Sequence, residues 1–399
     1  MDDLIEHDGP ESPPAAATAA APETAYLAEP APAPLPLSFS GSGAEYFRIW
    51  IVNLLLSVAT LGIYSAWAKT RRLQYFYRNT HLAGASFDFR GDPKAILRGR
   101  LVAVALLGAY HYAFGFSKTT GLAIVGLLLL GLPFMMRSAL RFRLSNTWYR
   151  GLPFGFNGSI GKAYLVYLLP IALILVPSAL AALTLDPGLL GGFFLLYLLW
   201  PLMHGAMRAY QQRHLMYGDQ QSRFTLSFAR LALPYLQGFL VSIALMLILG
   251  IVCGIIGAIA GVAGAFGGAD KKHLNMGFAV LIGIGIVLFY LSLLMIGPFV
   301  AVRLNNRAWS ATSFPGVLID CRMTVWAYFK VQFVNVLLTL LTLGLFHPFA
   351  AVRTWRYRVA HLRIEAPAGF EQATHAAQRR PAAATGDGVA DFLGVDLSW

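Results

Sequence analysis

Eight apolar segments constrain the fold of this chain more than any other feature. Most approach or exceed the ~20 helical residues that cross a hydrocarbon core of about 30 Å. They are Ile49–Ala68, Leu101–Phe116, Gly121–Met136, Ala163–Leu183, Leu189–Met207, Ala232–Phe266, Phe278–Val302 and Val331–Val352. The chain is 57% hydrophobic and 13% charged, with a mean hydropathy of +0.59. The sequence therefore predicts a polytopic membrane protein of the all-α class.

The two ends of the chain differ in composition from the part between them. Residues 1–37 are rich in Ala and Pro and carry acidic but no Lys or Arg side chains. They lack the basic start of a signal peptide and too few of them are apolar to form a core. We therefore expect a disordered acidic tail at 1–37, a membrane domain at 38–365 and a flexible tail at 366–399.

The basic residues are concentrated in a few of the connecting segments. Most of the 31 Lys and Arg lie in residues 69–100, 137–162, 205–230, 303–330 and 353–363. Basic connections stay on the cytoplasmic side of a membrane, where anionic lipids attract them. We expect the bilayer and anionic lipids of the inner leaflet as partners. Nucleic acid is excluded, because the Arg alternate with membrane segments and form no continuous solvated face.

The first and last apolar segments resemble each other. Glu45–Tyr77 aligns without gaps with Ala327–Val359 at an offset of 282 residues, which pairs Asn53 with Asn335, Gly62 with Gly344 and Arg71 with Arg353. Leu matches carry little weight in an apolar segment, so the Asn, Gly, Arg and aromatic matches matter most. They indicate an internal repeat.

A second repeat lies in the basic connections. "NTHLAGASFDFRG" at Asn79–Gly91 aligns with "NTWYRGLPFGFNG" at Asn146–Gly158, and Arg213–Ser227 and Arg303–Gly316 look like weaker copies. A Phe-x-Phe pattern after a glycine turn is typical of a short β-hairpin. The repeating unit is thus an apolar segment, an Arg-rich exit and a small cytoplasmic hairpin.

Two topologies are compatible with these repeats. If all eight segments span the bilayer, Ile49–Ala68 and Val331–Val352 run in opposite directions and one Arg cluster lies outside, against the positive-inside rule. In the alternative, six segments span and these two re-enter, turning at Gly62 and Gly344. We therefore expect six to eight transmembrane or re-entrant helices.

Polar groups within the apolar segments are few. A paired Asn53 and Asn335 are compatible with a shared pathway about a symmetry axis, or simply with hydrogen bonds between helices. Three histidines, His111, His204 and His347, lie in or at the ends of apolar segments, but no two of them are three or four residues apart, as neighbours on one helix would be. No Asp or Glu lies inside an apolar segment. No catalytic, phosphate-binding or metal-binding motif is present. We therefore predict no catalytic, cofactor or metal site and no enzymatic activity.

One part of the chain carries a specific resemblance. "EYFRIWIVNLLLSVATLGIYSAWAKTRRLQYFYRNTHLAG", followed by "FDFRGDP" and "ILRGR", resembles the YjgN family of bacterial inner-membrane proteins. The likeness is most specific in Glu45–Arg100 and extends to about Glu365. The resemblance implies a multi-pass protein of the bacterial inner membrane. The family has no established substrate, so the resemblance transfers no activity.

Two functions remain open on this sequence. The first is a channel- or transporter-like protein for a small solute or a lipid-related anion. Its candidate pathway residues are Asn53, Gly62, Asn335 and Gly344, and its candidate contacts to an anion or lipid head group are Arg71, Arg72 and Arg353. The second is a non-transporting scaffold whose basic hairpins bind anionic lipid, a protein partner or a second copy of the chain. An intramembrane enzyme acting on lipid comes third, with no motif in its favour.

Overall fold

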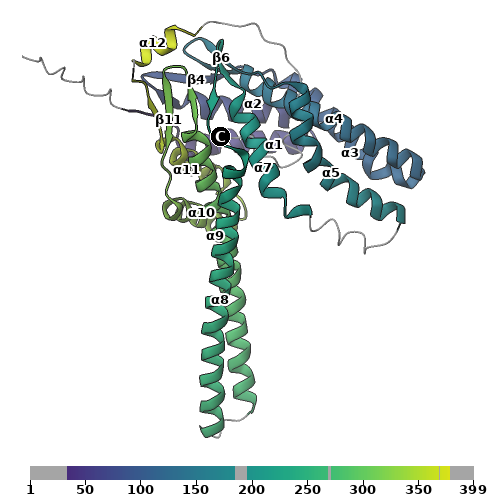
Figure 1. The fold of residues 1–399 in the computed structure, drawn as a ribbon, viewed down its shortest axis with the longest axis vertical. Coiled ribbons are helices and arrows are strands. Elements are labelled where there is room, and N and C mark those ends of the chain that lie inside the picture. Colours follow the sequence, from purple (N-terminus) through teal and green to yellow (C-terminus); the bar gives the residue numbers. More distant parts are fainter. Residues whose placement is uncertain (1–33, 185–195, 268–270, 368, 378–399) are drawn as a thin grey trace, which may run out of the picture.

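The computed structural model describes residues 34–184, 196–267, 271–367 and 369–377 (Figure 1). The helices in these ranges are α1 (Gly43–Ala59), α2 (Ser65–Arg78), α3 (Pro93–Phe116), α4 (Lys118–Ser145), α5 (Ile160–Thr184), α7 (Trp200–Arg213), α8 (Phe228–Gly267), α9 (Lys271–Ser310), α10 (Val325–Leu341), α11 (His347–Ala360) and α12 (Phe370–His375). The strands are β1 (Leu35–Pro36), β2 (Ser38–Phe39), β3 (Thr80–Leu82), β4 (Ala85–Phe89), β5 (Thr147–Tyr149), β6 (Leu152–Phe156), β7 (Leu215–Tyr217), β8 (Gln220–Gln221), β9 (Arg223–Phe224), β10 (Thr312–Phe314), β11 (Val317–Cys321) and β12 (Leu362–Glu365).

The helices of the described chain form five pairs that leave the strands and return to them. The pairs are α1–α2, α3–α4, α5–α7, α8–α9 and α10–α11, and the two helices of each pair pack on each other. A β-hairpin or its equivalent joins each returning helix to the next outgoing one. All strands consequently lie at one end of the helices, with the α8–α9 pair projecting furthest (Figure 1).

The strands close into a barrel. One sheet runs β1-β12-β11-β10-β9 and the other β2-β3-β4-β5-β6-β7-β8. Only Leu37 separates β1 from β2, and only Ser222 separates β8 from β9. The amide N–H of Leu37 donates to the Leu362 carbonyl at 3.3 Å, and that of Ser222 to the Leu215 carbonyl at 2.9 Å. Two short segments thus bridge both sheets, and the ring has no open edge.

The same hydrogen bond recurs at each junction between neighbouring units. In each case the donor is the backbone N–H of the residue that directly follows a strand. The acceptor is a backbone carbonyl at the end of a returning helix, in the neighbouring unit of the barrel. The bonds are Ser40 to Asn79 (2.9 Å), Arg90 to Asn146 (2.8 Å), Asn157 to His214 (2.9 Å), Thr225 to Ala311 (3.1 Å) and Arg322 to His361 (3.1 Å). The last hairpin position in the ring is filled by strands from both ends of the chain: β12 near the C-terminal end and β1 and β2 near the N-terminal end.

A local sequence rule explains three of these junctions. In Phe-x-Gly, the phenylalanine ring lies over the glycine, so that a Cβ on Gly41, Gly91 or Gly158 would come within 2.5 Å of a ring atom of the phenylalanine two residues earlier. Contacts that short do not occur without a shift of the ring. The motif therefore requires glycine at the point where strand gives way to helix.

The two segments near the chain ends whose sequences align, Glu45–Tyr77 and Ala327–Val359, each form a pair of helices joined by a tight turn. Gly62 and Gly344 have φ of +89° and +93° there, a region that glycine adopts without strain. Leu61 and Leu343 at the tips are 94% and 95% exposed. A helix of 17 residues such as α1 is about 25 Å long, less than the hydrocarbon core.

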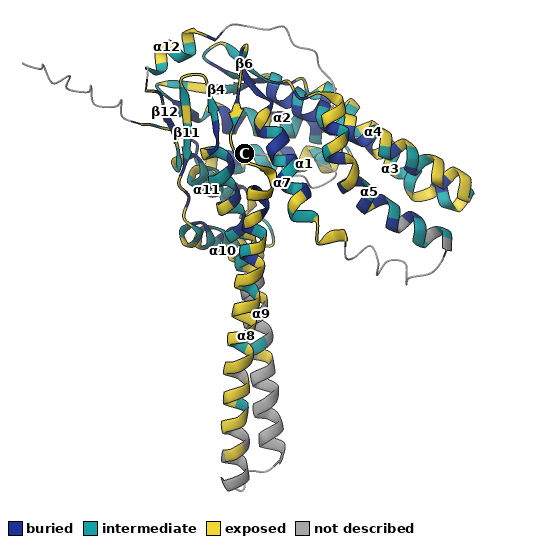
Figure 2. Ribbon diagram, in the orientation of Figure 1, coloured by how far each residue is buried: buried dark blue, intermediate teal, exposed yellow. Residues whose placement is uncertain are grey.

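Three helices of the described chain are long and apolar enough to cross a membrane: Lys118–Ser145, Ile160–Ala181 and Phe228–Ile259, with Val325–Leu341 a shorter apolar helix. The exposed face of α8 contrasts with the buried residues around the barrel (Figure 2). Of the other segments expected in the membrane, Leu101–Phe116 forms most of α3. Part of Leu189–Met207 and most side chains of Phe278–Val302 lie outside the described residues.

The structure departs from two sequence-based expectations. The all-α prediction included short hairpins in the connections between helices. It did not include the pairing of these hairpins with one another into a single barrel. That pairing was not predictable because pairs such as β1–β12 link residues at opposite ends of the chain. Residues 35–36 and 370–375, assigned to the tails at 1–37 and 366–399, form β1 and α12, which pack against the barrel. Residues 1–33 and 378–399 lie outside the described residues.

Candidate functional site

The barrel encloses an apolar chamber of about 230 Å³. Because side chains alternate along a strand, every second residue points inward. The inward residues that line the chamber come from strands all around the ring: Leu37, Leu82, Phe87, Tyr149, Phe154, Tyr217, Phe314, Val317, Ile319, Leu362 and Ile364. Their outward neighbours include Asp88, Leu318 and Arg363. The chamber thus depends on ring closure.

Aromatic rings dominate one wall of the chamber. Phe87 and Tyr149 stack with their centroids 4.6 Å apart, and Phe154 lies 5.2 Å from Tyr217. The tyrosine hydroxyls are satisfied within the wall, since Tyr149 donates to the Leu82 carbonyl (2.8 Å) and Tyr217 to the Tyr149 carbonyl (3.3 Å). Burial raises the pKa of Tyr149 and brings that of Tyr217 to about 12, so both rings are uncharged at neutral pH.

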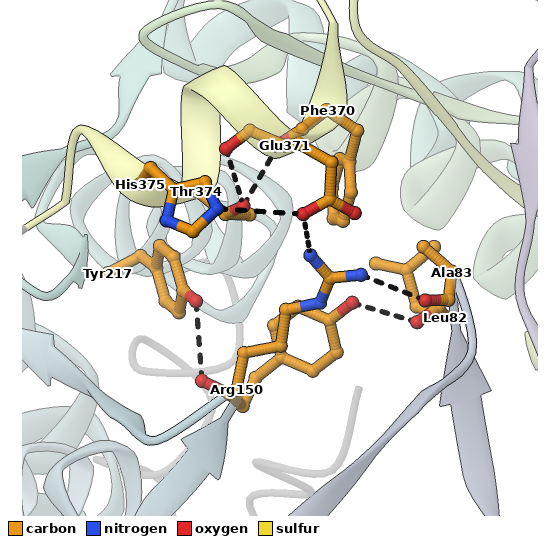
Figure 3. Close-up of polar contacts among 9 residues, drawn as sticks. Leu82, Ala83, Arg150, Tyr217, Phe370, Glu371, Thr374 and His375 are labelled. Atoms are coloured by element: carbon orange, nitrogen blue, oxygen red, sulfur yellow. Dashed lines mark hydrogen bonds and ion pairs between the residues drawn. The ribbon is translucent and has the colours of Figure 1, made fainter.

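Helix α12 covers the mouth of the chamber. The mouth is the end of the barrel formed by the hairpin turns, and Phe370, Ala373 and Thr374 of α12 line the chamber from there. The guanidinium of Arg150, in the β5–β6 turn, donates to Glu371 at 2.6 Å and to the Ala83 carbonyl at 2.9 Å, as Figure 3 shows. It also lies 5.3 Å from the Phe370 ring centroid. One arginine therefore ties α12 to two turns.

The charges of this contact support each other. The hydrogen bond from Arg150 holds the pKa of the Glu371 carboxyl below its usual range, and the same bond raises the pKa of Arg150. Because Glu371 is exposed, solvent screens the pair. The Arg150–Glu371 ion pair therefore sets the position of α12 but contributes little to the overall stability of the protein.

The ends of the returning helices form the floor of the chamber. Tyr77, Trp309 and Trp355 line it there. The indole N–H of Trp355 donates to the Thr80 hydroxyl at 3.1 Å, which ties α11 to β3. Two polar side chains also reach the floor, Asn305 of α9 and Arg358 of α11.

A second cavity of about 310 Å³ lies beneath this floor, among α7, α8, α9 and α11. It shares Asn305 and Arg358 with the chamber, and its other lining residues are His204, Arg208, Tyr235, Gly297, Val300, Ala301 and Leu304. It thus carries two arginines, and none of these lining residues is acidic. The shared residues make the two cavities neighbours across the chamber floor.

A glycine allows this cavity to form. A Cβ on Gly205 of α7 would lie 2.5 Å from the backbone carbonyl oxygen of Phe228, so glycine permits the first turn of α8 to approach α7. This approach brings the Nδ1 of His204 within 2.6 Å of the Tyr235 hydroxyl. The resulting hydrogen bond fixes both side chains in the cavity wall.

The four candidate pathway residues lie elsewhere. Asn335 is buried, and its amide nitrogen donates to the Ala350 carbonyl (3.3 Å) and to the Thr354 hydroxyl (3.1 Å), which joins α10 to α11. Asn53 is buried at the equivalent place in α1. Gly62 and Gly344 lie at the hairpin tips. The residues lining the two cavities include none of these four.

The three candidate head-group contacts lie on returning helices. Arg71 and Arg72 of α2 are exposed, and the Arg71 guanidinium lies 5.7 Å from the Tyr64 ring centroid. Arg353 of α11 is half-buried. They do not line the cavities either. The sequence pointed to Arg353 but not to Arg358, although both lie in the same basic segment, because only the fold determines which one reaches the chamber floor.

No group of three or more His, Cys, Asp or Glu side chains that could hold a metal ion occurs within the described residues. Cys321, buried in β11, has its pKa raised to about 12 by burial, so it is a protonated thiol.

Comparison with known proteins assigns a family. The profile of a family described as "Bacterial protein of unknown function (DUF898)" matches residues 34–392. The Inner membrane protein YjgN of Salmonella typhimurium strain LT2 is 31% identical over 158 residues, covering 37% of this chain and 38% of that protein. The protein of the same name from Escherichia coli K12 is 33% identical over 136 residues, covering 32% and 33%. No solved structure matches.

The aligned stretch thus spans well under half of these curated relatives, while the family profile covers most of the chain. The names of the relatives and the three apolar helices agree on a location in the bacterial inner membrane. The chain belongs to the DUF898 family, the YjgN-like inner-membrane proteins of unknown function.

Proposed function

We propose that this protein binds an apolar, lipid-like molecule in its barrel chamber, at the boundary between the inner membrane and the cytoplasm. The observation that carries the proposal is the chamber itself, closed by strands from the whole chain and lined by aromatic and aliphatic side chains. Engineered apolar cavities of about 150 Å³ stay dry and bind small apolar molecules. A chamber of about 230 Å³ is suited to the same kind of guest.

The apolar lining of the chamber supports this function. Water in contact with that lining finds few hydrogen-bond partners, so an apolar guest that displaces the water buries apolar surface. A bound chain of methylene groups recovers lost van der Waals contacts.

We propose that the barrel faces the cytoplasm and the helix pairs enter the bilayer from it. Every outgoing helix carries a basic residue near its start: Arg48, Lys94, Lys162, Arg230 and Lys330. This ring of cations suits contact with anionic head groups on the cytoplasmic side. In this arrangement α1–α2 and α10–α11 are re-entrant, while the longer pairs cross the membrane.

The recurring junction bonds further support an origin of the five units by repetition of one ancestral unit. In that view the two ends of the chain jointly supply one unit.

Binding is compatible with both roles considered from the sequence. A transporter would pass the bound molecule on, while a scaffold would retain it as a structural lipid. We favour a lipid-related ligand over a small solute because the chamber is lined almost wholly by apolar groups.

The test uses two neighbouring residues on β11 with opposite orientations. Val317 lines the chamber, while Leu318 is 48% exposed on the outer face. We expect Val317→Trp to fill the chamber and weaken binding of the apolar fluorophore N-phenylnaphthylamine at least tenfold. Leu318→Trp is the matched control and should bind like the unaltered protein. The measurement is fluorescence titration of full-length protein in lipid nanodiscs, with empty nanodiscs subtracted.

Equal binding by both folded variants would contradict the proposal. Circular dichroism melts of both establish that each variant is folded.

A further inference from the structure

We infer that the barrel chamber selects an uncharged molecule with a flat aromatic or conjugated ring system and rejects ions of either sign. This inference rests on the proposed function, since it names the class of apolar molecule that the chamber takes. It is carried by the hydrogen bonds of the lining side chains, by the rings of the wall and by the size of the chamber.

Hydroxyl groups that line the chamber donate to backbone carbonyls of the protein itself. The bonds are Thr80 to Phe76 (2.7 Å), Thr147 to Arg143 (3.0 Å), Thr374 to Phe370 (3.0 Å), Tyr149 to Leu82 (2.8 Å) and Tyr217 to Tyr149 (3.3 Å). A hydroxyl proton bound to a carbonyl does not serve a ligand. A carboxylate or phosphate that entered the chamber would therefore lose its water without gaining these donors in return.

Nitrogen donors of the lining are also engaged within the protein. The Trp355 indole has its partner in β3, and the amide of Asn305 donates to the Ala301 carbonyl at 2.9 Å. Among the described lining residues Arg358 carries a charge, and its Nη2 donates to the Tyr328 hydroxyl at 2.9 Å. The same guanidinium lies 5.8 Å from the Tyr328 ring centroid. An ionised guest thus finds lining donors that already have partners, and a cationic guest is repelled by the guanidinium.

The wall offers a series of rings to a flat guest. Phe87 lies 4.6 Å from Tyr149 and 6.2 Å from Phe154, measured between ring centroids. Phe154 lies 5.2 Å from Tyr217, and Tyr149 lies 6.4 Å from Phe370 of α12. Aromatic pairs at such centroid separations gain energy beyond the area that they bury. A flat ring system can extend this series, whereas a saturated chain gains from buried area alone.

The size of the chamber limits the guest. An engineered apolar cavity of about 150 Å³ holds one benzene molecule. The chamber, at about 230 Å³, is larger by an amount that suits two fused rings or a conjugated segment of similar size. A longer molecule would place only such a segment inside the barrel.

Three naphthalene derivatives test the rejection of charge. Methyl 2-naphthoate, 2-naphthoate and 2-naphthyltrimethylammonium share the fused rings and are neutral, anionic and cationic at neutral pH. Each is titrated against N-phenylnaphthylamine bound to full-length protein in nanodiscs of zwitterionic lipid, with empty nanodiscs subtracted. We expect the ester to displace the fluorophore at a concentration at least about tenfold lower than either ion.

Naphthalene and decalin test the preference for flat rings. They share a carbon skeleton, which is flat and aromatic in naphthalene and puckered and saturated in decalin. The ratio of their half-displacement concentrations is compared between protein variants, so their different partition into lipid cancels. We expect Phe87→Leu to shift this ratio about fivefold in favour of decalin, and Phe154→Leu to shift it in the same direction. The control is Phe333→Leu, on the exposed face of α10 outside the chamber, which should keep the ratio.

The outcomes separate the two proposals. If the protein binds no fluorophore, the proposed chamber function fails. If the ester and either ion displace the fluorophore equally, or if folded Phe87→Leu and Phe154→Leu variants keep the original ratio, the chamber function stands and the selectivity is overturned. An equal shift in Phe333→Leu would also overturn it, since a change outside the chamber would then explain the effect. The charged competitors need no substitution, so they decide the inference even where a variant does not fold.

Discussion

The barrel and the α10–α11 helix pair hold their residues together in opposite ways. In the barrel, Ile364 of β12 pairs with Leu35 at one edge and with Ile319 at the other, so neighbours in space come from distant parts of the chain. In the helix pair, Asn335 bonds Ala350 and Thr354, which lie within 19 residues along the chain. The barrel is therefore a cooperative, long-range structure, and the helix pair is a local one.

Because of this difference, a substitution in the barrel and a substitution in a helix pair should affect the structure over different distances. A defect at one strand of a closed ring opens an edge and exposes the chamber, so its effect spreads beyond the altered residue. A defect inside one helix pair leaves the other pairs and the ring in place.

The largest effect is expected from Ile364→Asp. Ile364 is buried and lines the chamber, and a carboxyl group there has no polar partner among the apolar residues around it. We expect a loss of roughly 3 kcal/mol in stability, together with faster hydrogen exchange in residues 35–39, which close the ring. Thermal unfolding and hydrogen–deuterium exchange measure the two effects.

The control is Arg363→Gln, one residue earlier on the outer face of β12. It should change stability by less than about 0.5 kcal/mol. If both variants weaken the protein equally, the inward and outward faces of β12 have been assigned incorrectly.

A smaller effect is expected from Asn335→Leu. It removes the bonds to Ala350 and Thr354, and polar contacts between helices in a membrane contribute about 1 kcal/mol. The loss should stay within the α10–α11 pair, with fluorophore binding unchanged because Asn335 does not line the chamber. Val336→Leu on the exposed side of the same helix is the control. A loss of binding in Asn335→Leu would restore the pathway role first considered for this residue.

The smallest effect on stability is expected at α12, where the pH dependence is informative. The pKa of Glu371 is lowered in the folded protein, so its contribution to docking is complete above the ordinary carboxyl pKa and is lost as pH falls through the lowered value. We expect α12 to stay docked from pH 8 to 5 and to loosen below about pH 4.

A Phe370→Trp variant provides the fluorescence signal for this measurement, since that ring lines the chamber mouth. Glu371→Gln in the same background should be loosened at all pH values and lack this transition. A transition of equal size in both would assign it to another group.

Much of the local structure was predictable from sequence. The hairpins at Asn79–Gly91 and Asn146–Gly158 are present, since Phe-x-Phe alternation and turn glycines act over a few residues. Gly62 and Gly344 have the same positive φ because the two segments share their sequence at the turn. The family and the membrane location were also predictable, because apolar length and a specific motif need no knowledge of tertiary contacts.

The candidate site was not predictable in the same way. No local pattern distinguishes Arg358 from Arg353, or Val317 from Leu318 as a chamber residue. Those roles follow from which strands pair and where each helix meets the barrel.

The sequence by itself determined that this is a membrane protein, that the chain turns at Gly62 and Gly344, and that Asn79–Gly91 and Asn146–Gly158 form hairpins, because these features depend on hydropathy and short-range sterics. Only the tertiary structure decided that the hairpins close into one barrel and that residues near both chain ends complete it. Pairing between residues more than 300 positions apart, such as Leu35 and Ile364, depends on the geometry of the whole ring and leaves no signal in either strand alone.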